Sequence, residues 1–403
     1  MIPVEEARAR ILAALSPVGV ETVALSESLG RVLAQPVTAR RLQPPKDLSA
    51  MDGYALRFED IGTLPVTLSV IAEVPAGGSF EETVPAGACV RIFTGGPLPD
   101  GTDTIVIQEN TDADEAAGTV TILEGSPEGR HVRRAGLDFA PGDILVDTGK
   151  RLGARDIGLA AAGNVPWVTV YRKPRVAILS TGDEIALPGD PIGPNQIVSS
   201  NGPALAAAVT AAGGVPTLMP IAPDDAESLQ ALARNAAGHD LLLTTGGASV
   251  GKHDLVGSAL AETGLELDFW KIAMRPGKPL MFGSFAGMPM LGLPGNPVSA
   301  LVCFLLFGRP ALTRLAGASN TGVTFTPARL GSALPENDRR EDYLRADLHR
   351  DESGHLIATP TQRQDSSMMS TLSQAGGLVR RLPHAPAAEA GATVDVLVFP
   401  DGF

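Results

Sequence analysis

The sequence predicts a multidomain protein that joins an α/β domain to domains built mainly from β-strands. Three observations predict this fold class. The chain has 403 residues, and at roughly 150 residues per domain that length corresponds to about two to four domains. Strand-like and helix-like segments alternate between residues 174 and 317, whereas short strand-like runs dominate residues 55–140 and 318–403. Apolar residues make up 44% of the chain, which is enough to build several buried cores.

The alternating segment has the clearest order. Runs rich in leucine and β-branched residues, such as 175–180 and 240–245, are separated by alanine-rich stretches such as 201–214. This pattern is typical of a parallel sheet with helices on both faces, which is a doubly wound α/β domain. Asp224 precedes another helical stretch, and Glu227 follows three residues later. The sequence therefore predicts that the Asp224 side chain caps that helix.

The other segments are predicted from shorter patterns. Alternating runs separated by Pro-Ala-Gly and Pro-Asp-Gly turns indicate a small β domain, and helical patterns at residues 3–15 and 153–163 flank it. These flanks suggest an N-terminal domain assembled from two pieces of the chain, and polar, strand-length runs after Gly317 indicate a C-terminal β domain. The predicted boundaries are 1–54 and 141–173 for the discontinuous N-terminal domain, 55–140 for the small β insertion domain, 174–317 for the α/β domain and 318–403 for the C-terminal domain.

Charge and cysteine content exclude several classes of protein. The chain carries 32 Lys and Arg against 45 Asp and Glu, a formal charge of −13, so as a whole it repels nucleic acids and anionic membranes. Cys89 and Cys303 are too few for a disulfide framework or a thiolate metal cage. The N-terminus lacks the pattern of a signal peptide, and the longest apolar run, Val298–Phe307, is about half of the roughly 20 residues that cross a bilayer. We expect a cytoplasmic protein that binds neither nucleic acid nor a membrane.

Polar residues follow two strands of the α/β domain. The first strand runs into Ser180, Thr181, Gly182, Asp183 and Glu184, and the second continues from Thr244 through Thr245, Gly246, Gly247, Ser249 and Gly251 to a helix near Asp254. Ligands bind at such carboxyl ends of parallel strands, and glycine-rich turns offer backbone amides to a phosphate or an oxygen-rich heterocycle. Either loop alone is equally consistent with an ordinary tight turn, but two such loops in one sheet favour a binding site.

The acids in these loops indicate a metal ion. Asp183, Glu184 and Asp254 would repel a phosphorylated ligand, and Mg²⁺ bridging carboxylates to phosphate oxygens would remove that conflict. The sequence therefore predicts magnesium, with Glu184 and Asp254 as its ligands. For Asp254 a capping role stays open, because the helix dipole stabilises an acid at the start of a helix by roughly 0.3 to 1 kcal/mol.

Three cations lie close together in the segment FWKIAMRPGKP. Lys271 and Arg275 are four residues apart on a predicted strand and would therefore share one face, and Lys278 follows after a Pro-Gly bend. In a protein of charge −13, such a cluster favours binding of an anion the size of phosphate or a metal oxyanion. The alternative is an ordinary solvated surface strand.

Several turns have both a structural and a functional interpretation. Pro294 and Pro297 bracket a Gly-Asn pair that includes Asn296, and they would fix the backbone of this loop, although a proline at a helix start is common. Local hydrogen bonding alone would explain three further turn residues, Asp52, Thr94 and Asp138. The sequence has no HExxH motif and no recognisable Ser-His-Asp constellation, so it gives no support for zinc hydrolysis or triad chemistry.

Six segments together are similar to a known family. They are SAMDGYA (49–55), RIFTGGPLP (91–99), LSTGDE (179–184), TTGGASVGKHD (244–254), MRPGKP (274–279) and LGLPGNPVSA (291–300). Each one alone is weak, but in this order and spacing the chain resembles the molybdopterin molybdenumtransferase family, called MoeA in bacteria, over nearly its whole length. The resemblance implies four domains, with a molybdopterin-binding α/β domain and a β-barrel-like domain at the C-terminus.

The resemblance also implies an activity. A member of this family takes adenylylated molybdopterin and molybdate as substrates, cleaves the phosphoanhydride, inserts molybdenum at the dithiolene sulfurs and releases AMP, with magnesium present. Members are homodimers whose cleft combines the α/β domain of one subunit with N-terminal and C-terminal residues of the other. A molybdopterin adenylyltransferase would act upstream.

The resemblance assigns roles to particular residues. Its functional acids and threonine fall on Asp52, Thr94, Asp138, Glu184, Asp224 and Asp254, and its basic residues fall on Lys271, Arg275 and Lys278. Its substrate loops correspond to Ser180, Thr181, Gly182, Asp183, Thr245, Gly246, Gly247, Ser249, Gly251, Pro294, Asn296 and Pro297. In the C-terminal domain, looser similarities indicate Arg345 and Ser366. The sequence departs from the family pattern at Arg275, where a lysine is usual, at Asp365, where a glycine is usual, and at Lys252-His253, where an acid is common after the glycine loop.

Two other functions are compatible with the same α/β domain. One is an adenylyltransferase that acts on molybdopterin with ATP, and the additional N-terminal and C-terminal domains argue against it. The other is a non-catalytic scaffold that keeps the pterin-binding fold, and the acids at positions 52, 184 and 254 argue against that.

Overall fold

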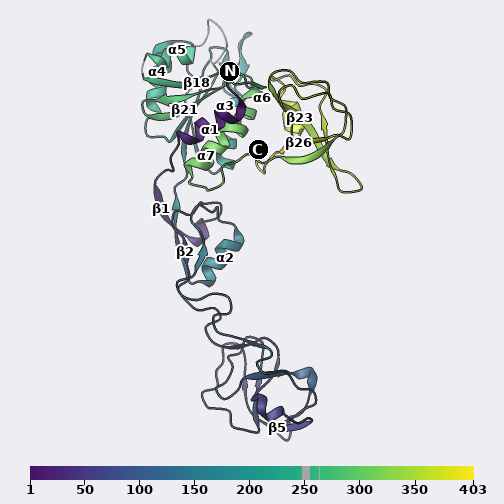
Figure 1. The fold of residues 1–403 in the computed structure, drawn as a ribbon. Helices are drawn as coiled ribbons and strands as arrows, with labels where there is room; N and C mark the ends of the chain where they lie inside the picture. Colours follow the sequence, from purple (N-terminus) through teal and green to yellow (C-terminus); the bar gives the residue numbers. More distant parts are fainter. Residues whose placement is uncertain (247–254, 263) are drawn as a thin grey trace.

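The computed structural model describes residues 1–246, 255–262 and 264–403. The chain forms an elongated molecule (Figure 1). The α/β domain and the C-terminal β domain lie at one end, and the small β domain, which contains β5 (Val66–Val74), lies at the other. The discontinuous N-terminal domain connects the two ends.

The sheet of the α/β domain has its parallel strands on one side and an antiparallel edge on the other. Its strand order is β16-β13-β17-β21-β20-β18. β13 pairs in parallel with β16 and β17, and β17 pairs in parallel with β21, whereas β20 runs antiparallel to β21 and to β18. The bounds are β13 (Arg175–Ser180), β16 (Val215–Leu218), β17 (Leu241–Thr245), β18 (Leu265–Trp270), β20 (Met281–Phe285) and β21 (Met288–Leu293).

The antiparallel edge departs from the predicted parallel sheet. β20 and β21 form a hairpin whose two turn residues, Ala286 and Gly287, have φ angles of 50° and 79°. Two positive φ angles give a turn that matches the twist of paired strands. Because Ala-Gly is not one of the dipeptides that usually form such turns, the sequence pattern does not reveal this hairpin.

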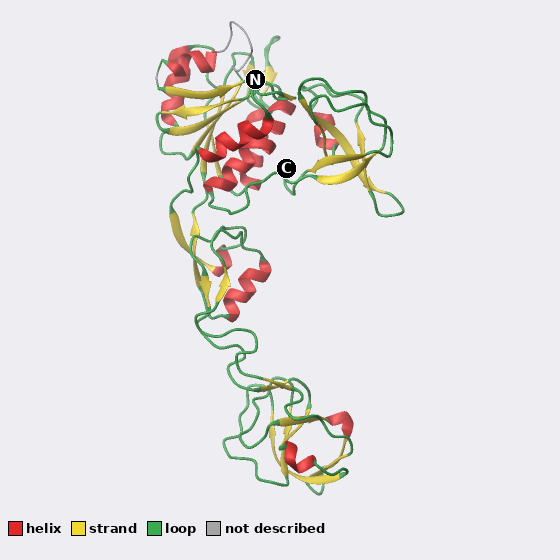
Figure 2. Cartoon of the chain, viewed as in Figure 1, coloured by secondary structure: helices red, strands yellow, loops and turns green. Residues whose placement is uncertain are grey.

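Alternate residues of β13 point into two different cores. Val176 and Ile178 pack with helices α3, α6 and α7, whereas Ala177 and Leu179 pack with α4 and α5. This alternation is expected of a strand that is buried on both faces, and Figure 2 shows helices on either side of the sheet. The predicted doubly wound α/β domain is confirmed. The helices are α3 (Asn201–Ala211), α4 (Ala226–Asn235), α5 (Leu255–Ala261), α6 (Pro297–Cys303) and α7 (Arg309–Leu315).

The first helix, α1 (Val4–Ala13), packs on the α/β domain. Its buried residues include Val4, Ala7 and Ile11, which recur at helical spacing and join the core that contains α7. The prediction of a helix here is correct, but its assignment to the discontinuous N-terminal domain is not what the structure shows. A helical repeat identifies the apolar face of a helix without identifying the surface that covers it.

One long apolar segment forms the centre of the α/β domain. α6 and α7 are joined by the π-helical turn η4 (Phe304–Gly308). Residues Pro297–Leu315 are long and apolar enough to cross a membrane by length and composition, but 83% of the most apolar window is buried inside the protein. The segment is therefore packed as a core helix.

The connecting domain and the small β domain are built from short strands. In the first, β1 (Val20–Ala24) pairs with β12 (Trp167–Tyr171), and β2 (Val37–Thr38) pairs with β11 (Ile144–Val146), beside α2 (Ala154–Ala162). In the second, the strand order is β7-β4-β6-β5-β9-β8. Besides β5, its strands are β4 (Gly53–Leu56), β6 (Ala88–Ile92), β7 (Thr104–Ile107), β8 (Thr111–Asp114) and β9 (Thr119–Ile122). A separate short pair is formed by β3 (Leu48–Ser49) and β10 (Val132–Arg133). The 3₁₀ turns of this half of the chain are η1 (Leu25–Glu27), η2 (Phe58–Ile61) and η3 (Gln108–Asn110).

The C-terminal strands close into a barrel. The order β23-β24-β22-β26-β25 is completed by pairing of β25 with β23. β19 (Met274–Arg275), from the α/β domain, adds to β23 in parallel and joins the two domains. The other elements are β22 (Thr326–Leu330), β23 (Glu341–Arg350), β24 (Leu356–Pro360), α8 (Met369–Gln374), β25 (Gly377–Arg381) and β26 (Thr393–Val398).

Candidate active site

The carboxyl ends of β13, β17 and β21 open into a pocket of about 490 Å³. This is where ligands bind in open α/β sheets. The pocket joins the two predicted polar loops to the proline loop. It is lined by Ser180, Thr181, Glu184, Ile185, Ile197, Val198, Ser199, Ser200, Asn201, Thr245, Gly246, Pro279, Pro294, Gly295, Asn296, Pro297 and Ser367.

A hydrogen-bonded cluster holds two of these loops together. Asn201 Nδ2 donates to Thr245 Oγ1 and to the Gly295 carbonyl, both at 2.8 Å. Thr245 Oγ1 in turn donates to the Pro294 carbonyl at 3.1 Å. Sequence reasoning missed Asn201, whose available signal was its position in a Ser-Ser-Asn segment ahead of a helix. Asn201 fixes the proline loop against the end of β17, so the pocket wall is preorganised.

Two of the predicted glycines are required by close packing. Gly246 has a φ of +94°, and a Cβ at this position would lie 2.9 Å from Thr181 Oγ1. Gly182 has a φ of +138°, and a Cβ there would lie 2.5 Å from Glu184 Oε2. Both φ values disfavour residues with a side chain. The first glycine lets the two strand-end loops meet, and the second lets the Glu184 carboxylate fold back over the loop.

The Thr181 hydroxyl is buried in the pocket wall and has no hydrogen-bond partner within the described residues. Leaving a buried hydroxyl without a partner costs about 1–3 kcal/mol, and such groups are few in native proteins. An unpartnered hydroxyl beside an open pocket is therefore a candidate contact for a polar ligand.

The acids of the first loop have different roles. Asp183 Oδ1 accepts a hydrogen bond from the Asp224 backbone N–H at 3.0 Å. The cap of α4 is Asp225, which accepts from Ser228 N–H at 2.8 Å, so the prediction that Asp224 caps this helix is wrong by one residue. The reason is that the chain turns one residue later than the spacing to Glu227 suggests. Glu184 remains as the carboxylate that lines the pocket.

The barrel contributes to the rim of the pocket through the turn at Ser366. Asn296 Nδ2 donates to Ser366 Oγ at 2.9 Å, and Val298 N–H donates to the Ser366 carbonyl at 3.1 Å. Ser367, which sequence reasoning missed, lines the pocket itself. Asp365 accepts from both the backbone N–H and the hydroxyl of Ser367. The unusual acid at position 365 therefore supports this turn.

Arg345 is buried near this turn but does not line the pocket. Its backbone N–H donates to Gln364 Oε1 at 3.0 Å, and its guanidinium donates to the Arg363 carbonyl at 3.3 Å. Burial lowers the pKa of the Arg345 guanidinium, while Asp365 opposes that change. Arg345 Nε has no partner within the described residues. Arg345 is a residue of β23, and its hydrogen bonds to Gln364 and Arg363 indicate a role in supporting the turn.

The three predicted cations do not share a strand face. β18 ends at Trp270, and Lys271 has a φ of +72° that turns its ammonium over the Trp270 ring, 3.9 Å from the centroid. The predicted strand through Lys271 and Arg275 is therefore interrupted. Backbone hydrogen bonds from Lys271 to Leu280 and from Ile272 to Lys278 close a loop instead. The backbone of Lys271 and that of Lys278 therefore lie close together where the loop closes, next to Pro279 in the pocket wall.

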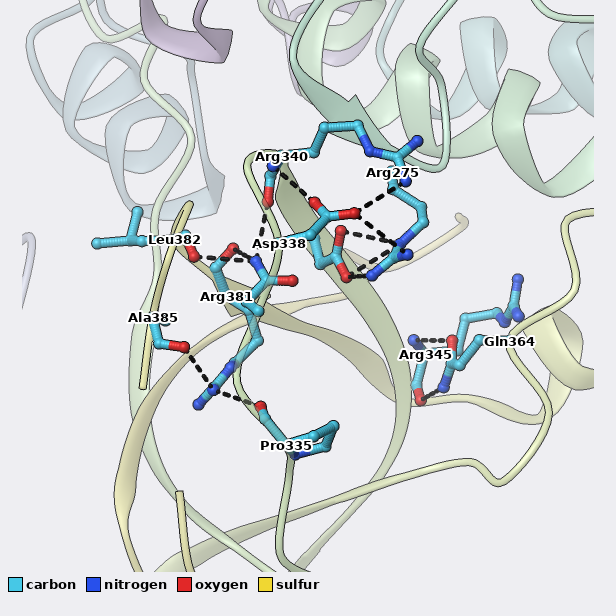
Figure 3. A network of polar contacts seen from close by, with 11 residues as sticks. Arg275, Pro335, Asp338, Arg340, Arg345, Gln364, Arg381, Leu382 and Ala385 are labelled. Carbon is cyan, nitrogen blue, oxygen red and sulfur yellow. Dashed lines mark hydrogen bonds and ion pairs between the residues drawn. The ribbon is translucent and has the colours of Figure 1, made fainter. Parts of the chain in front are cut away.

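Arg275 is engaged by the barrel. Its guanidinium forms an ion pair with Asp342, with Nε 3.0 Å from Oδ1, and a longer one with Asp338 at 3.7 Å (Figure 3). Asp338 also pairs with Arg340 at 3.1 Å. These contacts raise the pKa of the Arg275 guanidinium, chiefly through the hydrogen bond to Asp342. In this chain Arg275 links two domains.

Comparison with known proteins identifies the fold. Three family models match: the MoeA N-terminal region (domain I and II) at residues 2–163, a probable molybdopterin binding domain at 177–314 and the MoeA C-terminal region (domain IV) at 327–399. The chain is 40% identical to a molybdopterin molybdenumtransferase from Nostoc sp., over 82% of this chain and 77% of that protein. It is 32% identical to one from Haemophilus influenzae over 99% of both chains.

Solved structures of MoeA proteins have the same fold as this chain. Two crystal structures of the molybdopterin biosynthesis MoeA protein from Pyrococcus horikoshii superpose with TM-scores of 0.84 and 0.85, at 33% and 27% identity, and each comparison covers 99% of this chain. This chain belongs to the MoeA family. The resemblance inferred from the six sequence segments is thereby confirmed.

Three residues with predicted roles in the MoeA family lie outside the pocket of this chain. Asp52 and Thr94 meet in the small β domain, where Asp52 Oδ1 accepts from Thr94 N–H at 2.7 Å and from its hydroxyl at 2.8 Å. These two hydrogen bonds lower the pKa of the Asp52 carboxyl, and Arg91 adds to the effect. Asp138 is exposed in the connection between domains, where its N–H donates to Gln43 O at 2.9 Å. Figure 1 shows the small β domain at the far end of the molecule from the α/β domain.

Four further predicted residues, Gly247, Ser249, Gly251 and Asp254, lie outside the described residues. Their predicted roles in binding the ligand and the metal stay predictions.

Proposed function

We propose that this chain is a molybdopterin molybdenumtransferase that takes adenylylated molybdopterin and molybdate, transfers molybdenum to the dithiolene and releases AMP. The observation that carries this function is the preorganised pocket at the carboxyl ends of β13, β17 and β21, in a chain that belongs to the MoeA family along nearly its whole length. The chain is a transferase of molybdenum cofactor biosynthesis.

The polar groups of this pocket suit a phosphorylated pterin. The unpartnered Thr181 hydroxyl offers a hydrogen bond to the ligand, and Gly246 lets a ligand approach the backbone closely. Asn201 and Thr245 hold the proline loop in place before the substrate arrives. A preorganised site loses little free energy on ordering when it binds.

The pocket is compatible with magnesium. Within the described residues the Glu184 carboxylate accepts no hydrogen bond and forms no ion pair, and no three Asp, Glu, His or Cys side chains there form a metal cage. Mg²⁺ is commonly held by one or two carboxylates together with substrate phosphates and water, so Glu184 fits, with Asp254 as the predicted second ligand. When bound, the ion would neutralise charge on the phosphoanhydride oxygens.

We assign the molybdate site to the closed end of the loop at residues 271–280, beside Lys271 and Lys278. Lys271 and Lys278 are brought together there by the two backbone hydrogen bonds of the loop. A doubly charged oxyanion is attracted to lysine side chains such as these two. Arg275 contributes less to this attraction, because Asp342 and Asp338 already neutralise it.

A homodimer would complete the site. Asp52 and Thr94 flank strands of the small β domain, which lies at the far end of the molecule from the α/β domain, so their predicted role requires a second copy whose small β domain reaches the pocket. We place the enzyme in the cytoplasm, downstream of a molybdopterin adenylyltransferase.

The test is anaerobic incubation of the purified chain with adenylylated molybdopterin, with and without molybdate, followed by measurement of AMP. We expect AMP release that depends on both molybdate and magnesium. Consumption of ATP in the presence of molybdopterin would instead favour the adenylyltransferase, and binding of the pterin without AMP release would favour the scaffold.

A further inference from the structure

A second pocket lies where three domains meet. Its volume is about 800 Å³, which is within the range of small-molecule sites. Its walls are the loop at residues 147–151 of the connecting domain, the end of α3, helix α7 and the linker at 318–324. The end of β26 from the barrel completes it. None of the residues predicted for catalysis is among the residues that line this pocket.

Two arginines reach this pocket from different domains. Arg151 comes from the connecting domain, where its Nη1 donates to the Gly30 carbonyl at 2.7 Å, and Arg309 is the first residue of α7. Both side chains are accessible to solvent. Burial, together with the positive charge of Arg309, lowers the pKa of the Arg151 guanidinium. Both arginines line this one pocket.

Neither arginine is neutralised by an acid in the part of the chain that the structure describes. The lining acid, Asp147, forms no ion pair with either of them there. Lys150, also in the lining, is already paired with Asp156 at 2.6 Å. In a chain of net charge −13, two accessible arginines that line one pocket and pair with no acid among the described residues are unusual, and an anion bound in that pocket would neutralise both.

The rest of the lining suits the organic part of a ligand. Val323 and Val398 supply apolar surface, while Thr148 and Thr321 supply hydroxyl groups. Ser319 N–H donates to the Gly149 carbonyl at 3.1 Å and so ties the linker to the connecting domain beside the pocket. The cavity is much larger than an inorganic phosphate ion needs, since a drug-sized ligand fills roughly 300 Å³ or more.

We propose that this pocket binds a small phosphate monoester, with its phosphate group held by Arg151 and Arg309 and its organic part along Val323 and Val398. The planar guanidinium group binds phosphate oxygens with two parallel hydrogen bonds, which makes arginine more suitable than lysine for this recognition. Because the two arginines belong to different domains, the bound ligand holds the connecting domain against the α/β domain. This site is independent of the activity proposed above.

The experiment is calorimetric titration of the full-length protein with ribose 5-phosphate, beside ribose as the unphosphorylated control. We expect ribose 5-phosphate to bind and ribose not to bind. Arg309→Ala should weaken the binding at least tenfold, because a hydrogen-bonded charge is removed. Arg309 is the preferred position because the structure records no side-chain contact of its guanidinium among the described residues, so the variant should fold normally. Arg155→Ala, which removes an arginine of α2 outside the pocket, is the matched control and should bind as the wild type does.

A second measurement separates this site from the candidate active site. Ribose 5-phosphate should raise the melting temperature of the wild type and of Lys271→Ala, but not that of Arg309→Ala. Equal binding by wild type and Arg309→Ala would overturn the proposal, as would binding of ribose and ribose 5-phosphate with equal affinity. Absence of any heat or thermal shift at millimolar ribose 5-phosphate would overturn it too.

Discussion

The pocket of the α/β domain and the Asp52–Thr94 pair of the small β domain represent two kinds of predicted site. The pocket is concave, is held by side-chain hydrogen bonds across three loops, and has an unpartnered buried hydroxyl in its wall. Asp52 is only partly buried, and Thr94 already supplies it with two hydrogen bonds. The pocket therefore has the shape and the polar groups to hold a ligand, whereas the Asp52 carboxylate is an oriented charge that lies outside that pocket.

The largest expected effect concerns the pocket. Glu184→Gln removes the charge of the one described carboxylate that lines it and should lower the turnover number for AMP release by roughly 10² or more, the scale seen when a key electrostatic group is lost. The fold should be unaffected because Glu184 is exposed. Asp183→Asn is the matched control, since Asp183 serves the backbone of Asp224 and should change turnover less. Near-normal turnover of Glu184→Gln with an unchanged melting curve would reject the assignment.

The second prediction tests whether the two regions cooperate across chains. Asp52→Asn and Glu184→Gln should each release AMP much more slowly than the wild type when assayed alone. When the two variants are unfolded together and refolded as a mixture, AMP release should return to about a quarter of the wild-type rate, because about half of the dimers are mixed and each mixed dimer has one intact cleft. Recovery shows that Asp52 serves the partner's pocket. A mixture as inactive as its components, with mixed dimers demonstrated by mass spectrometry, would contradict this arrangement.

These two regions also show what could be predicted from sequence. The ends of β13 and β17 were predictable because a buried parallel strand is a continuous apolar run and the polar loop after it stands out. The Ser-Ser-Asn segment marked Asn201 as the start of a helix, but its hydrogen bonds to Thr245 and Gly295 were not predictable, since these partners are distant in sequence and a hydrogen bond between loops has no periodic pattern. The same holds for the packing of α1 on the α/β domain and for the ion pair between Arg275 and Asp342, because both depend on contacts between segments that are distant in sequence.

A third prediction separates the two basic residues of the loop at 271–280. Lys271→Ala should raise the molybdate concentration for half-maximal AMP release about tenfold with little change in melting temperature, since the loss of one charge contact costs on the order of 1.4 kcal/mol. Arg275→Ala should mainly lower stability, by about 1–3 kcal/mol, because it leaves the Asp342 carboxylate, whose side chain is only 4% exposed, without its partner. Steady-state kinetics and urea denaturation measure the two effects. Equal effects of both variants on the molybdate dependence would show that Arg275 also holds the oxyanion.

The smallest expected effect concerns the charge state of Asp52. The backbone N–H and the hydroxyl of Thr94 stabilise the ionised carboxyl, so the pKa of Asp52 lies below its ordinary value in the folded protein. A carboxyl with a lowered pKa adds stability at pH values above the pKa of the unfolded chain, near 3.9, and this contribution disappears as the pH falls through the lower folded pKa. Asp52 is consequently ionised throughout the neutral range.

Thr94→Val tests this cause directly, because it keeps the backbone donor and removes the hydroxyl. The pKa of Asp52, followed by NMR titration of its carboxyl carbon, should rise towards the ordinary value and stay below it, since the hydrogen bond from the Thr94 backbone N–H is the larger influence. Thr121→Val, which removes a hydroxyl that pairs with Thr67 in the same domain, should leave the Asp52 titration unchanged. If Thr94→Val also left the pKa of Asp52 unchanged, the hydroxyl would not stabilise the ionised carboxyl. The role predicted for Thr94 would then be a direct contact with the partner's pocket.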